Sequence, residues 1–181
     1  MGQVILVWHS ASSWIYLQGN DQEYSQDMNK MNSIKEYIMD ALQTSRFAVL
    51  ATEGNGQPHM SLIAISPFGD FRHIIFATYR DTLKYRNISS NNKVAVLIES
   101  GVTNAKDSKQ SVVLTIIGHT EEINIAGNEA AYQEHLKRHP EMKSFMLSSD
   151  CALFMVIAQS YQIVNGIDDI RWITADELDS S

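Results

Sequence analysis

The 181-residue sequence has little of what would place a protein in a membrane or outside the cell. Its single cysteine, Cys151, cannot form an internal disulfide, which favours a reducing compartment. The apolar stretch Val4–Trp8 is too short to span a bilayer. No Lys or Arg precedes Lys30, so the charged region of a secretory signal is missing. We therefore expect a cytoplasmic protein.

Positive charge is also scarce. Lys and Arg total 14 against 21 Asp and Glu, which gives a formal net charge of -7. Nucleic acids and anionic membranes need an extended basic surface, so neither is an expected partner. With 44% hydrophobic residues and no low-complexity tract, the chain predicts one globular domain at residues 31–181. Residues 1–30 read as an extension of uncertain role: an added segment, an extra edge strand or an upstream translated segment.

Several catalytic and metal-binding patterns are missing as well. No Ser-His-Asp, Cys-His or paired-carboxylate set points to hydrolysis. His135 and His139 stand four residues apart on a predicted helix, as metal ligands can, but no carboxylate or cysteine completes a zinc pattern. We interpret them as a solvated pair and predict no metal site. Cys151 adjoins the apolar run Ala152–Ala158 and is interpreted as a core thiol.

The first regular elements are a helix and a hairpin. Ser33 and Glu36 form a capping box for a helix that runs to about Thr44, with apolar residues at helical spacing. Two β-rich segments, Phe47–Thr52 and Gln57–Ile65, flank a Gly-Asn-Gly turn at residues 54–56. That pattern predicts a β-hairpin.

The rest of the chain adds short strands at close spacing. Ser66–Asp70 is predicted as a turn, Gly101–Lys109 as a loop and Asn128–Arg138 as a helix. Further strands are predicted at His73–Thr78, Val94–Ile98, Ser111–Ile117 and Cys151–Ala158, and a last strand-turn-strand block at Tyr161–Ile173. Six or seven strands joined by hairpins and one helical crossover predict a small antiparallel barrel with helices outside.

One junction in the chain looks suited to a phosphate. The strand ending at Thr78 runs into a polar turn, where Asp81 and Thr82 are residue types that begin helices. The first amides of a helix have no intrahelical acceptor and bind anions well. Donors suited to phosphate oxygens cluster here: Arg80, Thr82, Lys84 and Arg86. The alternative is that the three cations form a solvated helix face.

This junction and the hairpin before it resemble the flavin mononucleotide (FMN) site of the pyridoxamine 5'-phosphate oxidase-like split-barrel family. The resemblance covers about Ser33–Leu178. It implies a mainly β, six- to seven-stranded antiparallel split barrel with flanking helices, forming a homodimer with FMN between the subunits. Thr78 and Thr82 match hydroxyl phosphate ligands and Lys84 matches a phosphate lysine. The cofactor-binding residues predicted at the junction are Thr78, Tyr79, Arg80, Thr82, Lys84 and Asn87.

In this family the second hairpin strand lies along the flavin, and its Gly-x-Pro-His-x-Ser pattern is present at residues 56–61. Alternation places His59 and Ser61 on one strand face and Met60 and Leu62 on the other. The resemblance implies that these four residues line the ring, with Ser61 adding a side-chain hydrogen bond. For His59, a structural or solvent-facing role is the alternative.

The C-terminal block looks most like the haem-utilisation branch of the superfamily. That branch usually has Gly-Phe-Gly-Arg where this chain has Gly-Ile-Asp-Asp at residues 166–169, and its haem-ligating histidine comes from a C-terminal extension that this sequence lacks. Gly118–Glu121 matches a family Gly-x-x-Glu that follows a central strand. Arg171 and Trp172 are candidates to cover the flavin of a partner subunit, the alternative being a terminal strand packed on its own barrel. The family's Arg-x-His substrate motif has no counterpart after them.

The resemblance implies an FMN-dependent oxidoreductase of unknown substrate, in which the isoalloxazine accepts a hydride and the protein binds and orients it. Haem degradation and vitamin B6 oxidation are not expected, because their motifs are missing. A non-catalytic FMN carrier or sensor is one alternative. A haem-binding or haem-handling protein of the same fold is another.

Overall fold

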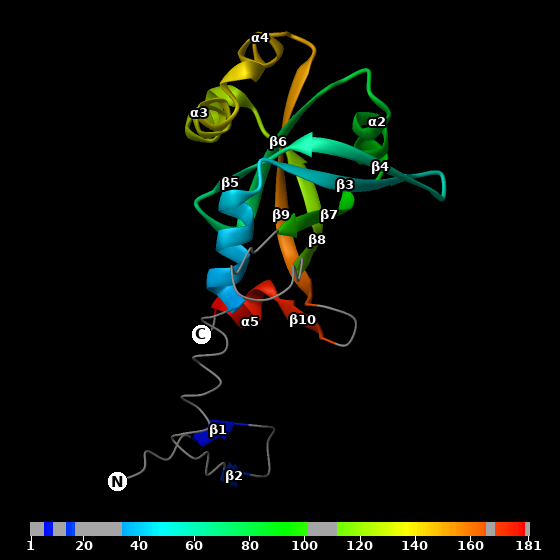
Figure 1. The fold of residues 1–181 in the computed structure, drawn as a ribbon. Helices are drawn as coiled ribbons and strands as arrows, with labels where there is room; N and C mark the ends of the chain where they lie inside the picture. The colour runs from blue at the N-terminus through cyan, green and yellow to red at the C-terminus, as the bar shows by residue number, and fades with distance from the viewer. Residues whose placement is uncertain (1–5, 9–13, 17–33, 101–111, 166–168, 180–181) are drawn as a thin grey trace.

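Eight antiparallel strands form the sheet around which the chain is arranged, in a computed structural model that describes residues 6–8, 14–16, 34–100, 112–165 and 169–179 (Figure 1). The strands are β3 (Phe47–Gly54), β4 (Gln57–Ala64), β5 (Ser66–Phe68), β6 (Asp70–Tyr79), β7 (Lys93–Ser100), β8 (Val112–Glu122), β9 (Cys151–Val164) and β10 (Ile170–Thr174). Their order is β4-β3-β7-β8-β9-β6-β5. β9 pairs with β6 through its first half and with β10 through its second.

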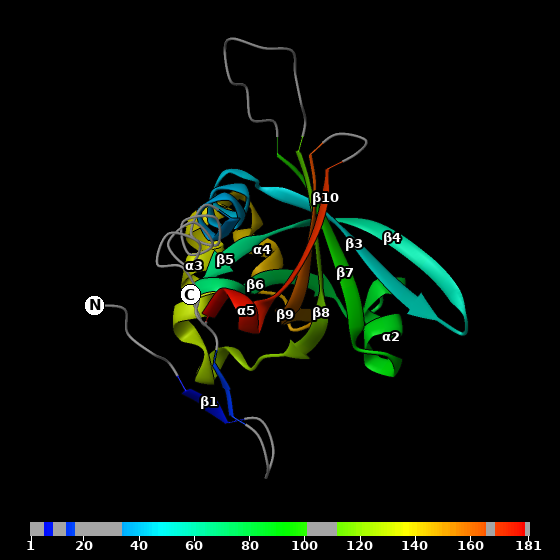
Figure 2. The ribbon, with the colours of Figure 1, turned by 90° about the horizontal axis from the view of Figure 1, so that it is seen from below.

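Helices flank this sheet on several sides (Figures 1 and 2). They are a helix at residues 34–44, α2 (Leu83–Ser90), α3 (Glu129–Arg138), α4 (Lys143–Met146) and α5 (Ala175–Asp179), with 3-10 turns η1 (Ile125–Gly127) and η2 (Pro140–Met142). α2 lies at the opposite side of the molecule from α3 and α4 in both views. The split barrel with outer helices that the sequence predicted is confirmed.

The predicted hairpin is confirmed in its turn and its register. Asn55 and Gly56 both have positive φ, 54° and 79°, as a two-residue hairpin turn requires. The tight turn sets Gly54 opposite Gln57, and therefore Thr52 opposite His59. On β4, Met60 and Leu62 are 72% and 69% exposed, so the predicted alternation is also confirmed.

Two details differ from the prediction. Ser66–Phe68 is the short strand β5 rather than part of a turn, because it pairs with β6; the chain reverses only at Gly69, where φ is +73°. Gly118–Glu121 does not follow a strand but lies inside β8, which continues past a register shift at Ile117 and Gly118. A Cβ at Gly118 would lie 2.1 Å from the carbonyl oxygen of Ile157, so only glycine allows this approach.

The hydrophobic core has two parts. The larger lies inside the barrel and receives the predicted apolar stripe of the helix at residues 34–44, with Ile38, Ala41 and Leu42 all fully buried. The smaller packs α3 and α4 on the other side of β6 and β9, through residues such as Ile75 and Leu153. β6 is therefore covered on both faces, which fixes the position of its end.

The N-terminal residues that the structure describes form a separate pair, β1 (Leu6–Trp8) and β2 (Trp14–Tyr16), outside the eight-stranded sheet. The predicted boundary at residue 30, the capping Ser33 and the loop Gly101–Lys109 lie outside the described residues. Across the part of the chain that is described, no helix has the length and apolar character needed to cross a membrane.

Candidate functional site

The junction between β6 and α2 has the predicted strand–turn–helix form. Thr82 is the N-cap of α2, with extended backbone (φ -79°, ψ 154°). Its Oγ1 accepts a hydrogen bond from the amide of Tyr85 at 3.3 Å and donates one to the carbonyl of Tyr79 at 2.8 Å. The two bonds fix the helix start, so the first amides of α2 face out of the turn.

The structure brings the two predicted hydroxyl ligands together. Thr78 Oγ1 lies 3.0 Å from Thr82 Oγ1, and Thr78 itself is buried. Lys84 follows in the first turn of α2 and is half-buried, and this burial lowers the pKa of its ammonium group. Among the described residues no carboxylate forms an ion pair with Lys84. Two hydroxyls, a lysine and a helix N-terminus suit an anion.

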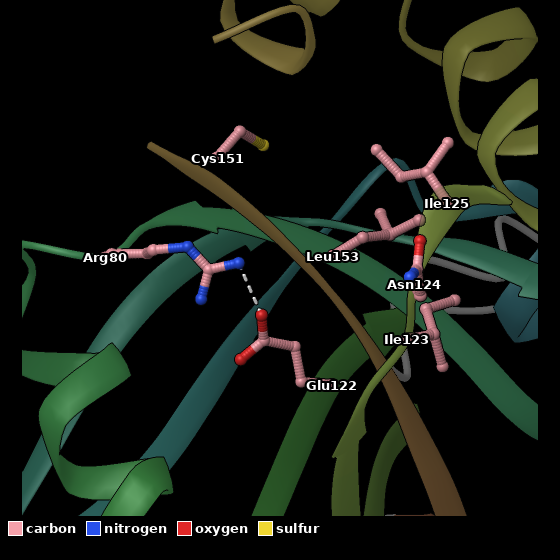
Figure 3. Close-up of a pocket in the computed structure, with 7 residues that line it drawn as sticks. All are labelled: Arg80, Glu122, Ile123, Asn124, Ile125, Cys151 and Leu153. Atoms are coloured by element: carbon pink, nitrogen blue, oxygen red, sulfur yellow. Dashed lines mark ion pairs between the residues drawn. The ribbon is translucent and has the colours of Figure 1, made fainter. Parts of the chain in front are cut away.

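Arg80, which was also predicted at the junction, contacts other side chains in this structure. Its guanidinium donates to the hydroxyl of Tyr85 at 2.7 Å and forms an ion pair with Glu122 at 2.5 Å (Figure 3). The hydrogen bond with Glu122, and then that with Tyr85, raises the pKa of Arg80. The side chain faces a pocket of about 400 Å³, whose lining does not include Thr78, Thr82 or Lys84. That pocket is lined by Arg80, Glu122, Ile123, Asn124, Ile125, Cys151 and Leu153.

Two neighbours of Arg80 also point elsewhere. The ring of Tyr79 packs edge-on against the ring of Phe145 in α4, with ring centroids 4.5 Å apart, and not against the threonine pair. Arg86 is exposed and donates to the carbonyl of Asp81 at 2.8 Å. For Arg86, the solvated helix face is therefore the better description. Cys151 is half-buried at the pocket rather than in the core, and burial raises the pKa of its thiol to about 11.

Asn87 connects α2 to the hairpin. Its Nδ2 donates to Thr52 Oγ1 at 3.1 Å, and Thr52 Oγ1 donates in turn to the carbonyl of His59 at 3.4 Å. A Cβ at Gly54 would lie 2.3 Å from Asn87 Oδ1, so glycine makes room for the amide. The helix that carries Lys84 is thereby tied to the strand predicted to line the flavin.

On that strand, two buried polar atoms have no hydrogen-bond partner among the described residues: His59 Nδ1 and Ser61 Oγ. Both residues are half-buried, on the β4 face that continues to buried Ile63. An unpaired buried polar atom costs free energy, so such atoms usually have a partner in the working protein. A flavin ring carries carbonyl and N–H groups that can supply one. The residues present therefore fit a flavin nucleotide, with the phosphate at the N-terminus of α2 and the ring along β4.

Arg171 and Trp172 lie on β10, which pairs with β9 of its own barrel. Arg171 donates two hydrogen bonds to Asp169, at 2.9 and 3.1 Å. Trp172 is 59% exposed, while the next residue, Ile173, packs into the core. The strand packs on its own barrel and leaves the indole of Trp172 exposed in the single chain, and the covering of a partner's flavin by Arg171 and Trp172 stays a prediction.

The histidine pair is not solvated, and that prediction was wrong. His135 and His139 are fully buried, with ring centroids 5.0 Å apart. Polar groups at β5 allow their burial: His135 Nδ1 lies 2.9 Å from Ser66 Oγ, and His139 Nε2 lies 2.9 Å from the carbonyl of Ile65. Burial lowers the pKa of His135 to about 4. The described residues contain no cluster of three or more possible metal ligands.

Three residues at the site were missed by the sequence analysis: Thr52, Tyr85 and Glu122. The hairpin turn does place Thr52 opposite His59, so that residue could have been found from the register. Nothing in the sequence pairs Glu122 with Arg80, because the two residues are 42 positions apart in the chain (122 minus 80).

Comparison with known proteins identifies a family. A family model described as "Pyridoxamine 5'-phosphate oxidase" matches residues 34–155, a range that includes Thr78, Thr82 and Lys84 but not Trp172. A Schizosaccharomyces pombe protein named as a pyridoxamine 5'-phosphate oxidase homolog is 32% identical over 91 residues. That match spans 44% of this chain and 48% of the relative, about half of its length.

Two solved structures share the fold. A heme binding protein from Mycobacterium smegmatis superposes with a TM-score of 0.71 at 18% identity, over 81% of this chain and 60% of that one. A FAD-binding protein from Mesorhizobium loti gives 0.59 at 13% identity, over 70% and 90%. The family model spans more than half of the chain, and the barrel is the one that these structures share. The chain therefore belongs to the pyridoxamine 5'-phosphate oxidase-like split-barrel family.

Proposed function

We propose that this protein binds FMN and acts as a flavin-dependent oxidoreductase. The observation that carries the proposal is the pair of threonine hydroxyls, Thr78 and Thr82, 3.0 Å apart at the N-terminus of α2 and followed by Lys84. Helix amides and one cation match the oxygens and charge of a phosphate ester, and each hydroxyl can donate to it by turning its single proton away from its present partner. Family membership supports the same ligand.

The ring is proposed to lie along β4. Ser61 Oγ and His59 Nδ1 are the unpaired polar atoms there, and each can exchange a hydrogen bond with a polar group of the ring. The bound flavin supplies hydride acceptance, while these residues bind and orient it. The hydrogen bonds from Asn87 through Thr52 to β4 fix the position of α2, which is proposed to bind the phosphate, relative to β4, which is proposed to line the ring.

A homodimer is proposed because large apolar side chains on one face of the sheet are exposed among the described residues. Strand register places Leu62 and Leu97 in one row with Trp172, across β4, β3, β7, β8, β9 and β10. All three side chains are at least 41% exposed. Apolar faces of this kind are typical of subunit interfaces. In such a dimer, Arg171 and Trp172 of one subunit are proposed to cover the ring held by the other.

The visible spectrum of the purified protein tests the ligand. We expect the absorbance of a bound flavin, and we expect this flavin to be released as FMN when the protein is denatured. The mass of the protein in solution should correspond to two chains. A Soret band on addition of haem, without flavin binding, would instead favour a haem-binding protein, as the name of the Mycobacterium smegmatis structure suggests for that relative. Absence of both would contradict the proposal.

Reduction by NADH or NADPH separates an enzyme from a carrier. An oxidoreductase is expected to lose its flavin absorbance on addition of a nicotinamide donor and to recover it in air. A carrier or sensor is expected to keep the spectrum unchanged across the same donors. The second result would leave the FMN site in place and overturn the catalytic part of the proposal.

A further inference from the structure

We propose that Arg80, Tyr85 and Glu122 form a clamp that shapes the phosphate site without contacting the phosphate. Arg80 is then a positioning residue and not a ligand. This inference rests on the proposed function, because the site that the clamp positions is the one assigned to the FMN phosphate.

The three side chains contact one another in a closed triangle. Arg80 donates to the hydroxyl of Tyr85 at 2.7 Å and to Glu122 at 2.5 Å, and the Tyr85 hydroxyl donates to Glu122 at 3.2 Å. The Arg80 guanidinium also lies 5.4 Å from the centre of the Tyr85 ring. Displacing any one of the three groups therefore breaks two contacts, which gives the cluster a single preferred arrangement.

The clamp joins both sides of the phosphate turn to the sheet. Arg80 precedes Thr82 in the turn, and its amide donates to the carbonyl of Asp150 at 3.0 Å. Tyr85 follows Thr82 in the helix, and its amide donates to the Thr82 hydroxyl. Glu122 is the last residue of β8, so it provides a fixed point on the central sheet. Thr82 is held between two residues that are tied to the same carboxylate.

Packing fixes the other end of Tyr85. Its ring lies edge-on to Phe154 of β9, with centroids 5.9 Å apart, and is partly buried where it packs against the main core. The hydroxyl of Tyr85 is thus presented to Arg80 by a side chain whose ring does not move freely. This anchoring explains how a clamp at the surface can control geometry in the first turn of α2.

The direction of the Arg80 side chain argues against a ligand role. It faces the pocket that contains Cys151 and Leu153, and both terminal nitrogens of its guanidinium already have partners (Figure 3). The threonine pair and Lys84 do not line that pocket. Arg80 and Glu122 are 40% and 37% exposed, so their ion pair contributes little to stability. Its proposed role is to hold the phosphate turn in position.

The sign of one substitution distinguishes the two roles. Glu122→Gln removes a negative charge near the phosphate site, so electrostatics alone would tighten FMN binding. If Glu122 only competed for a ligand Arg80, the same variant would also bind FMN more tightly. The clamp predicts the opposite: the FMN dissociation constant rises about tenfold, as expected when a charge-assisted hydrogen bond to phosphate is misaligned. Riboflavin, which lacks the phosphate, should bind the variant and the parent protein equally.

A charge exchange provides the matched control. Arg80→Glu alone is expected to weaken FMN binding, whereas Arg80→Glu combined with Glu122→Arg restores the ion pair and should recover most of the loss. A phosphate-contacting arginine could not be rescued in this way, because a carboxylate would then face the phosphate. Failure of the double variant to recover, with an unchanged thermal midpoint, would overturn the clamp.

Tyr85→Phe keeps the ring and its packing but removes the hydroxyl, so it tests the clamp even if a charge variant folds poorly. It should weaken FMN binding with little change in thermal midpoint. Failure of the parent protein to bind FMN would overturn the proposed function and this inference together. If the parent binds FMN while Glu122→Gln and Tyr85→Phe bind it as well or better, only the clamp is overturned.

Discussion

The β6–α2 junction, where we propose that the phosphate binds, and the histidine cluster at α3 are both polar groups next to the sheet, yet they differ in what their polar atoms face. At the junction, Lys84 is half-buried and has no ion pair within the described residues. At the cluster, His135 and His139 are fully buried, His135 bonds Ser66 of β5, and His139 bonds the carbonyl of Ile65 just before that strand. Donors that a molecule can reach indicate binding, whereas donors enclosed by the chain indicate structure.

Unpaired atoms occur in both regions, which sharpens the comparison. Among the described residues, His59 Nδ1 and Ser61 Oγ of β4 have no hydrogen-bond partner, and neither does His135 Nε2 of α3. The difference is that His59 and Ser61 are half-buried residues, while His135 is not accessible at all. An unpaired buried atom therefore suggests a ligand only where part of the residue can be reached from outside.

The largest expected effect belongs to His135 and concerns stability in acid. Its pKa is about 4 in the folded protein and close to 6.5 when unfolded, so the unfolded chain binds more protons between these values. The contribution of the neutral His135 to the free energy of unfolding is therefore fully present above pH 6.5. It is lost as the pH falls towards 4, which lowers the free energy of unfolding by about 3 kcal/mol. The neighbours Arg138 and His139 favour the neutral ring, and Glu141 opposes them.

Denaturant unfolding at several pH values measures this effect. His135→Asn has an amide able to bond Ser66 but does not titrate, so its unfolding free energy should depend less on pH, by about one proton between pH 4 and 6.5. FMN affinity at neutral pH should not change. Parallel pH curves for the variant and the parent protein would show that His135 is not the group responsible.

Lys84→Ala should give the next largest effect, and on binding instead of stability. Losing the cation beside the threonine hydroxyls should raise the FMN dissociation constant about 10- to 100-fold, the range for one charge-assisted hydrogen bond. Arg86→Ala is the matched control, since it removes the same charge two residues away from a side chain that only contacts the Asp81 carbonyl. If a flavin titration shows the same loss of FMN affinity for both variants, the effect comes from the general positive charge of α2 and not from a specific site at Lys84.

Ser66→Ala should destabilise the protein by about 1–3 kcal/mol, because it leaves His135 Nδ1 buried without its partner. Ser89→Ala removes an exposed hydroxyl that bonds the carbonyl of Tyr85 and should be nearly neutral. Thermal unfolding of the two variants measures the contrast. A flavin titration should show no loss for Ser66→Ala, and a loss there would connect the two regions that the structure separates.

The sequence was informative where local rules decide the structure. The Asn55-Gly56 turn determines the hairpin register, and Thr82 at the N-cap determines the start of α2. Both depend on neighbours in the chain. The resemblance to a family added the meaning of Thr78, Thr82 and Lys84, which spacing alone left open against a solvated helix face.

The errors arose where distant residues decide. Ser66 is far from His135 in the chain, so the hydrogen bond that allows the histidine to be buried has no local signal. The long-range ion pair of Glu122 with Arg80 likewise has no local signal, and whether Arg80 binds the phosphate stays a prediction. A cation in a motif can serve the ligand or the protein, and only its partner across the fold distinguishes these two roles.

Ser61→Ala is expected to give the smallest effect and the most informative one, because binding and stability should move in opposite directions. Its hydroxyl is buried and has no partner in the described part of the chain, so removing it should stabilise the ligand-free protein by up to about 1 kcal/mol. The same change removes a hydrogen bond to the ring and should weaken FMN and riboflavin alike, by about fivefold. Thermal unfolding without flavin and titration with both flavins measure the two quantities. A variant that loses stability without flavin would mean that the hydroxyl already has a partner in the protein, and β4 would then resemble the histidine cluster instead of a ligand-binding strand.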